Sequence, residues 1–507
     1  MMQEIILFDY IKTHLDDQGR YTENQLPDRP TPDLLKNLGA EDAMGYAVDA
    51  SVDTEGAQRS ITLLKQYAAH PGMETRRQLT DYLNSISVSR MADCFLENFT
   101  TDDLQESMLD LAEEYFYHSS TREPLKFAYL LFGLYGMEQL QKDEPELWRN
   151  LLTIAHCEEF TFHFIYGCRI TNFLPQAELW ELAYCTHGWG KVYAINSLNF
   201  TTQEQRLWLI ENGYDLEADY PPLSVRMITE SKLGEFLKAD QLDHSCFKGA
   251  LAILNNFLLL TNSFDIATLN QNFNIASINL PQLLEDLLRH GEQYRENPAD
   301  VLDLVALDLG LKTIMENENW YKLTFNQCNL LIAHCESIIF SQDWQNYIPA
   351  HLLNEQGKID YILCDLAFEL ALDITDQLQD YFFQHPQETK LFPYLLAQEG
   401  EAYADKIIAY IENNLPLYLN SPHDLTIPLR YLAGQPGSGV NIVSAALVSI
   451  FDMPRCMACM TLEAWGPQQL TPSLLSALHT AAGLAQSPFA KACTDRLLQL
   501  AGQKLSL

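Results

Sequence analysis

Apolar residues recur along most of the chain at spacings of three and four. Residues with these spacings share one face of an α-helix, so each run predicts an amphipathic helix that ends near polar residues, Gly or Pro. Clear examples are Leu104, Met108, Leu111, Ala112 and Tyr115, and then Leu283, Leu284, Leu287 and Leu288. We find no series of short alternating β-branched runs joined by Asn-Gly or Asp-Gly turns, which is the pattern of strands. The sequence therefore predicts an all-α protein.

Two sites show the residues that begin helices. Thr201-Thr202-Gln203-Glu204 resembles a capping box ahead of an apolar run, and Thr471-Pro472 places Pro in a first helical turn. Helices are thus expected to begin near residues 203 and 472.

One order of residues recurs within the expected helices. After Pro454, a basic residue (Arg455) is followed by a small residue three positions later (Ala458) and by Leu seven positions later (Leu462). The order returns as Lys191, Ala194 and Leu198, and more loosely as Lys126 with Tyr129 and Gly133, Lys248 with Leu251, and Lys491 with Thr494 and Leu498. Arg455 and Lys491 lie 491 − 455 = 36 residues apart, a spacing typical of repeated helix pairs.

The window from Asp452 to Leu462 resembles the second helix of a HEAT repeat, and the looser copies resemble degenerate HEAT or armadillo units. The segment 187–194 is similar to a segment of uncharacterised bacterial helical-repeat proteins. This resemblance implies an α-solenoid, a right-handed superhelix of HEAT-like antiparallel helical hairpins. Such proteins are mostly scaffolds and adaptors. The copies are missing through much of 300–420, where a non-repetitive helical insertion is the alternative.

The chain of 507 residues is too long for one hydrophobic core, which stops growing at about 250–300 residues. We divide it into an N-terminal helical region (1–140), central HEAT-like hairpins (141–295), a divergent helical region (296–425) and C-terminal HEAT-like hairpins (426–507). The Gly- and Pro-rich joints are short, which favours one continuous superhelix over separate beads.

The chain has 32 Lys and Arg against 68 Asp and Glu, a formal net charge of −36. Such a surface repels phosphate backbones and anionic lipid headgroups, so we expect no direct binding to nucleic acid and none to membranes. It attracts a basic protein or peptide, although the charge also serves solubility. The apolar runs are shorter than the ~20 residues of a membrane span. Eleven cysteines scattered through apolar patterns indicate a reducing, cytoplasmic location.

His156, Glu159 and His163 form the best metal-like group, because steps of three and four place them on one helical face. The segment is not HExxH and no second ligand helix is visible, so the alternative is a solvated polar stripe. The sequence predicts no metal and no cofactor.

Cys456-x-x-Cys459 has the spacing of a redox or zinc pair, and residues 434–439 form a Gly-rich segment ahead of a helix. Neither has the surroundings of a known motif. Buried thiols and a turn between helices are the favoured interpretations.

Trp180, Trp189 and Lys191 are the candidate partner-binding residues, because Trp and basic side chains anchor interfaces. Packing between hairpins is the alternative. The first functional hypothesis is a protein- or peptide-binding scaffold. An enzyme with a site in the solenoid groove and an acidic mimic of nucleic acid are the alternatives, with no catalytic residue assigned.

Overall fold

The computed structural model describes residues 5–29, 37–47, 53–214, 218, 220–273, 275–317, 321–396, 402–421, 423–485 and 488–505. Its internal contacts divide the chain into two compact units. The first contains most of the chain up to Ile339, and the second contains residues 340–505 together with residues 296–302.

Helices make up both units. Those of the first unit are α1 (Leu7–Thr13), α2 (Ala40–Ala47), α3 (Thr54–Ala69), α4 (Met73–Leu83), α5 (Val88–Asn98), α6 (Glu106–His118), α7 (Arg122–Tyr135), α8 (Met137–Asp143), α9 (Pro145–Ile154), α10 (Glu158–Ile170), α11 (Gln176–Cys185), α12 (Gly188–Ile195), α13 (Gln203–Asn212), α14 (Leu223–Ser231), α15 (Leu233–Leu237), α16 (His244–Ser263), α17 (Ile266–Phe273), α18 (Leu280–Gly291) and α20 (Phe325–Ile339). Helix α19 (Pro298–Asn317) belongs to the second unit up to residue 302 and to the first unit from residue 303. Those of the second unit are α21 (Trp344–His351), α22 (Tyr361–Glu369), α23 (Thr375–Gln384), α24 (Phe392–Leu395), α25 (Ala402–Asn413), α26 (Thr426–Ala433), α27 (Val440–Leu447), α28 (Asp452–Trp465), α29 (Pro472–Leu484) and α30 (Pro488–Leu505). Short 3₁₀ turns lie at Thr101–Asp103, Ile275–Ser277, Thr389–Leu391, Leu415–Tyr418 and Pro467–Gln469.

Strands are absent from the described residues, where two isolated bridges, Leu15 with Tyr21 and Leu353 with Ile359, are the β-type pairings. The predicted all-α class is therefore confirmed. In the part of the chain that the structure covers, no helix combines the length and the apolar character that crossing a membrane requires.

The predicted helix starts are also confirmed. Thr202 caps α13, because its hydroxyl accepts a hydrogen bond from the Gln205 amide at 3.2 Å while the Gln205 side chain accepts one from the Thr202 amide at 3.1 Å. Thr471 caps α29, accepting from the Leu474 amide at 3.3 Å, with Pro472 as the first helical residue. Both caps satisfy amides that a helix end leaves without partners.

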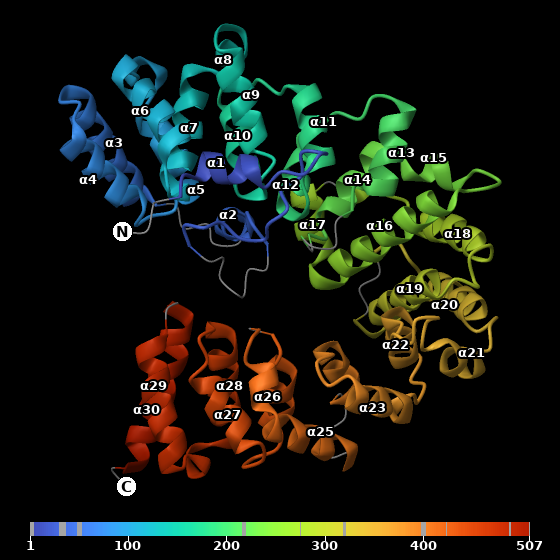
Figure 1. Cartoon of the computed structure of the whole chain (residues 1–507). Coiled ribbons are helices and arrows are strands. Elements are labelled where there is room, and N and C mark those ends of the chain that lie inside the picture. The colour runs from blue at the N-terminus through green and yellow to red at the C-terminus, as the bar shows by residue number, and fades with distance from the viewer. Residues whose placement is uncertain are drawn as a thin grey trace. The chain divides into compact units, whose positions relative to one another are not determined.

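Successive helices of the first unit stand side by side (Figure 1). α6 packs on α7, α7 on α10, α10 on α12, and α11 on α12. The contact between α7 and α10 is very close at Gly133, where an added Cβ would lie 2.8 Å from the Cα of Gly167. Backbones can approach this closely because glycine has no side chain.

The packing continues through the later helices of this unit. α16 contacts α13, α14 and α18, and α18 contacts α20. A Cβ added at Gly249 of α16 would lie 2.0 Å from the carbonyl oxygen of Ile210 in α13, a second close approach. Arg226 of α14 donates to the carbonyl of Ile195, the last residue of α12, at 3.1 Å and to that of Leu198 in the following loop at 2.5 Å. A basic side chain thus satisfies a carbonyl that the helix end leaves unpaired.

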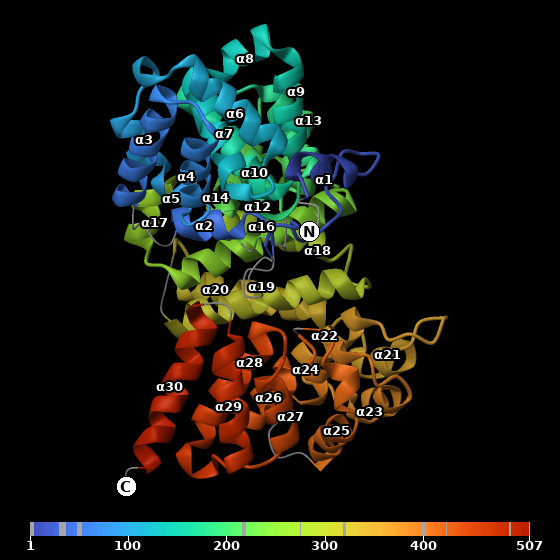
Figure 2. The same ribbon diagram turned by 60° about the vertical axis from the view of Figure 1, so that its left-hand side comes forward.

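Helix α28 lies in contact with α26, α27 and α30 in the second unit (Figure 2). Arg455 is 1% exposed, and its guanidinium bonds Asp452 and donates to the Ser449 carbonyl at 2.6 Å. Ala458 is fully buried on the same face. Thr461 donates to the Leu429 carbonyl of α26 at 2.9 Å. The face of α28 that carries Arg455, Ala458 and Thr461 is therefore buried.

Replacing Ala458 with Leu is expected to cost about 1–3 kcal/mol, because extra methylenes overpack a filled helix contact. Hydrogen exchange followed by mass spectrometry should show faster exchange in α26, α28 and α30, and unchanged exchange in α13 and α16. Met460 is 51% exposed on the same helix, so Met460→Leu is the matched control and should change nothing. Equal protection in the Ala458→Leu protein and in the control would contradict the packing described.

Candidate functional site

A cluster of buried charges lies where α7 meets α10. Lys126 is fully buried, and its ammonium lies 2.8 Å from Asp42 Oδ2, 2.7 Å from Glu159 Oε1 and 3.4 Å from Glu123 Oε1. Charges this deep are tolerated when each has partners of the opposite sign. Lys126 is thus the centre of a network that joins α2, α7 and α10.

Arg122 lies one turn before Lys126 and holds a second part of the network. Its guanidinium is 2.6 Å from Asp28 Oδ1 and 3.2 Å from Glu159 Oε1, and it donates to the Arg29 carbonyl at 2.8 Å. The amide of Gly39 donates to Glu159 Oε2 at 3.0 Å. We call the described residues between 5 and 47 the N-terminal segment, and these bonds fasten it to α7 and α10.

The network sets the charge states of its members. Burial alone would raise the pKa of Asp42, but Lys126 and His163 lower that pKa below its ordinary value. Burial alone would lower the pKa of Lys126, but Asp42, Glu123 and Glu159 raise it well above its ordinary value. Burial raises the pKa of Glu123. Ion pairing therefore keeps Lys126 and Asp42 charged inside the protein.

The residues predicted as a metal-like group belong to this region. His156 lies two residues before α10 begins, its Nδ1 2.8 Å from the Gly19 carbonyl and its Nε2 3.1 Å from Glu181 Oε1. Glu159 pairs with Lys126, and His163 Nε2 lies 3.1 Å from Asp42 Oδ2. Each of the three contacts a different set of partners.

Two details of the expectation for this group are corrected. The three residues do not share one helical face, because His156 precedes the helix. They are not a solvated stripe either, since none of the three side chains is more than 4% exposed. The N-terminal segment covers them, with Gly19 on His156 and Asp42 on His163. Among the residues that the structure describes, no group of three or more His, Cys, Asp or Glu side chains is arranged to hold a metal ion.

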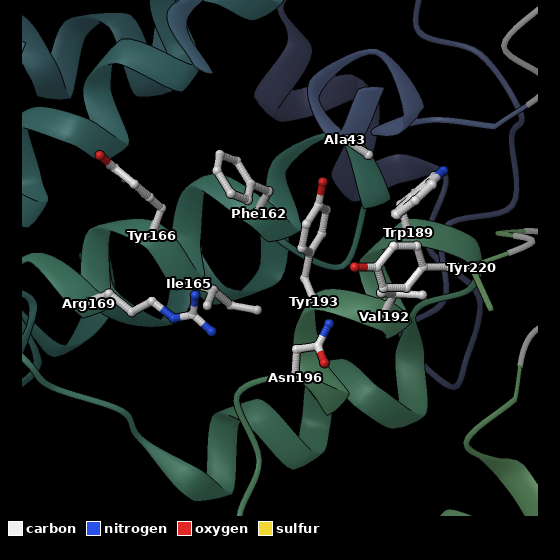
Figure 3. Close-up of a pocket in the computed structure, with 10 residues that line it drawn as sticks. All are labelled: Ala43, Phe162, Ile165, Tyr166, Arg169, Trp189, Val192, Tyr193, Asn196 and Tyr220. Carbon is white, nitrogen blue, oxygen red and sulfur yellow. The ribbon is translucent and has the colours of Figure 1, made fainter. Parts of the chain in front are cut away.

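A pocket of about 190 Å³ opens between α10 and α12 (Figure 3). Trp189 packs on Tyr220 with ring centroids 5.4 Å apart, and Tyr193 packs on Phe162 at 5.0 Å. Ala43 of the N-terminal segment forms part of the wall. The lining from α10 and α12 follows a three-and-four spacing, so the pocket is made by facing sides of two neighbouring helices.

The predicted partner-binding residues fall in two places. Trp189 lines the pocket, whereas Trp180 packs on Trp208 with ring centroids 5.0 Å apart. The Lys191 ammonium lies 6.0 Å from the centroid of the Trp208 ring, within cation–π range. We call Trp180, Tyr184, Lys191 and Trp208 the Trp208 cluster. The sequence grouped three residues that the structure assigns to two separate surfaces.

The cysteine pair and the glycine-rich segment have structural roles in the fold. Cys456 and Cys459 are buried free thiols, and burial raises the pKa of each to about 12, the opposite of a reactive thiol. Residues 434–439 join α26 to α27, with Gly437 and Gly439 at φ of +85° and +60°. Glycine is favoured in that left-handed region. The structure thus agrees with the favoured interpretations, which are buried thiols for the cysteine pair and a turn between helices for residues 434–439.

Asp28 and Asp42, which pair with the buried cations Arg122 and Lys126, were not predicted from the sequence. The sequence does indicate that such partners exist, because Arg122 and Lys126 lie in a largely apolar helix and must be paired if they are buried.

Compared with known proteins, the chain matches no family model, no curated protein and no solved structure.

Proposed function

We propose that the chain is an α-solenoid of HEAT-like hairpins that acts as a scaffold and binds a peptide segment of a partner protein. Consecutive packing of α7, α10 and α12, and of α26, α28 and α30, supports the repeat architecture. Lys126 and Arg455 hold the basic position of the repeated pattern, and both are buried and paired with carboxylates. The basic residues of the other windows lie elsewhere, since Lys191 lies over the Trp208 ring and Lys248 and Lys491 are exposed, so burial of the basic position supports the pattern in these two windows.

The observation that carries the binding function is the pocket between α10 and α12. Stacked helices leave a continuous surface on which repeat proteins bind extended partners. Trp189, Tyr193 and Tyr220 line this pocket, and Trp and Tyr are the side chains that most often dominate interface energy. A peptide lying along this face would place one side chain in the pocket.

The charge of the chain bears on the rest of the peptide. A net charge of −36 attracts basic segments over distances of about 10 Å at ordinary ionic strength. We therefore propose a partner with basic residues outside the pocket, whose association slows as salt is added. The enzyme, the nucleic-acid mimic and the cytoplasmic location stay predictions from the sequence.

A display selection of random peptides on the full-length protein tests this function. Selected peptides should bind wild type and lose affinity about tenfold or more on Trp189→Ala, the effect of removing an interface anchor. Tyr184 is 52% exposed in the Trp208 cluster, so Tyr184→Ala is the matched aromatic control and should bind as wild type does. A selection without enrichment, or peptides that tolerate Trp189→Ala, would overturn the proposed site.

A further inference from the structure

One cation at the pocket stands without a carboxylate partner. The chain has 68 acidic residues against 32 basic ones, yet none of the described carboxylates lies within ion-pair distance of Arg169. Its guanidinium donates one hydrogen bond, to Ser197 Oγ at 2.8 Å. A guanidinium has several N–H donors in a planar fork that matches a carboxylate. Those donors remain available at the pocket.

Two further polar groups in the lining have no protein partner among the described residues. The Tyr193 hydroxyl is buried and makes no hydrogen bond, and the Asn196 side-chain amide makes none either. Figure 3 shows the Arg169 guanidinium and the Asn196 amide near the Cβ end of the Tyr193 side chain, whereas the Tyr193 hydroxyl points the other way, toward Ala43. The Tyr193 hydroxyl is buried and points away from these two groups, so the Arg169 guanidinium and the Asn196 amide are the polar groups that a ligand in the pocket would meet.

The rest of the lining favours a ligand that carries an aromatic ring. Trp189, Tyr220 and Phe162 present aromatic surfaces, and aromatic pairs gain energy in offset or edge-to-face contact. The volume of about 190 Å³ is below the 300 Å³ at which pockets for drug-sized ligands roughly begin. The pocket therefore suits one aromatic ring and a small polar group.

From this arrangement we infer that the pocket binds a carboxylate joined to a single aromatic ring, with Arg169 and Asn196 on the carboxylate and Trp189 and Tyr220 on the ring. The carboxylate can come from the last residue of a peptide, Phe or Tyr, or from a free aromatic acid. The peptide source rests on the proposed function, whereas the recognition itself does not.

The charges argue against the other classes of ligand. A Lys or Arg side chain in the pocket would face the Arg169 guanidinium, because the other lining residues carry no formal charge. A dianionic phosphate would meet one cation inside a protein of net charge −36, which is unfavourable. A monoanion with a flat acceptor pair fits one guanidinium fork.

Ligand-observed ¹⁹F NMR on the full chain tests the inference with a matched pair, N-acetyl-4-fluorophenylalanine and its carboxamide. The acid should bind with a Kd of about 1 mM, the level that ordinary ligand efficiency gives a single-ring compound. The amide should bind about tenfold or more weakly, because it cannot form the charge-assisted pair. Short peptides ending in 4-fluorophenylalanine, as acid or amide, test the peptide source.

Variants assign the effect to its residue. Arg169→Gln should weaken the acid about tenfold and leave the amide unchanged, and Arg169→Lys should lie between because it keeps the charge without the fork. Arg149 is an exposed arginine of α9 outside the pocket, so Arg149→Gln is the control and should bind as wild type does.

Each outcome decides the question. Equal binding of acid and amide, an acid that tolerates Arg169→Gln, or no binding at about 10 mM, tenfold above the expected Kd, would overturn carboxylate recognition. Binding of the free acid together with failure of the peptide selection would reject the scaffold and keep this site. Binding of peptide acids alone would identify the peptide as the source.

Discussion

Replacing Lys126 with Met is expected to lower the free energy of unfolding of the first unit by about 3–5 kcal/mol, the range found when one partner of a buried ion network is removed. Asp42, Glu123 and Glu159 lie within 3.4 Å of the Lys126 ammonium, and without it their charges stay in the interior with Arg122 as the remaining cation of α7. Met fills a volume similar to that of Lys, so the loss of unfolding free energy measures the removed charge and not a cavity.

Urea unfolding and hydrogen exchange measure this effect. Exchange should quicken in 5–29 and 37–47 as well as in α7 and α10, because the network fastens the N-terminal segment. Lys142 also pairs with a glutamate, Glu138, but both side chains are more than half exposed, so Lys142→Met should cost less than about 0.5 kcal/mol. If Lys126→Met also lowered the unfolding free energy by less than about 0.5 kcal/mol, the value expected of an exposed pair, the result would contradict the network.

A second variant separates the network from a general defect in folding. Asp42→Asn removes one of the charges that Lys126 neutralises. The double variant Lys126→Met, Asp42→Asn should therefore lose less unfolding free energy than the two single variants lose together. Additive losses would mean that Lys126 and Asp42 act independently.

Replacing Gly133 with Ala is expected to destabilise the first unit by about 1–3 kcal/mol, although the same change usually stabilises a helix by roughly 0.5–1 kcal/mol. The new Cβ would lie 2.8 Å from Gly167 Cα and 2.9 Å from the Gly167 carbonyl oxygen. These are backbone atoms of α10, which cannot move without shifting the helix. The clash therefore outweighs the gain in helix propensity, and Gly133→Ala lowers the free energy of unfolding.

Gly483 of α29 is the matched control, because a Cβ there would meet no atom within 4 Å. Gly483→Ala should stabilise its unit by up to about 1 kcal/mol. Urea unfolding monitored by hydrogen exchange, unit by unit, gives both values. Two changes of the same sign would mean that α7 and α10 do not meet as closely as described.

The local features of this fold were readable from the sequence. The apolar spacing of Leu104 to Tyr115 predicted α6, and the Thr202 and Thr471 caps marked where α13 and α29 begin. The resemblance of the window from Asp452 to Leu462 to a repeat helix predicted α28. Each of these depends on neighbours within a few residues, which is the range over which helix periodicity and capping operate.

The candidate site was not readable in the same way. Asp28 and Arg122 are 94 residues apart in sequence, and no periodic pattern encodes a pairing at that distance. Trp180 and Trp189 belong to different helices, so tertiary packing decides that one joins the Trp208 cluster and the other the pocket. His156 fits the spacing of α10 but precedes it, because a three-and-four spacing does not mark where a helix starts.

Photo-crosslinking of a selected peptide, followed by mass spectrometry, tests the central claim most directly, since it locates the bound peptide on the folded chain. With 4-azidophenylalanine, a photoreactive residue with a single ring, in place of the residue that fills the pocket, we predict adducts on residues 162–169 of α10 and on residues 189–196 of α12 and its C-terminal end, and their loss on Trp189→Ala. Adducts on the Trp208 cluster or on the second unit, unchanged by Trp189→Ala, would contradict it.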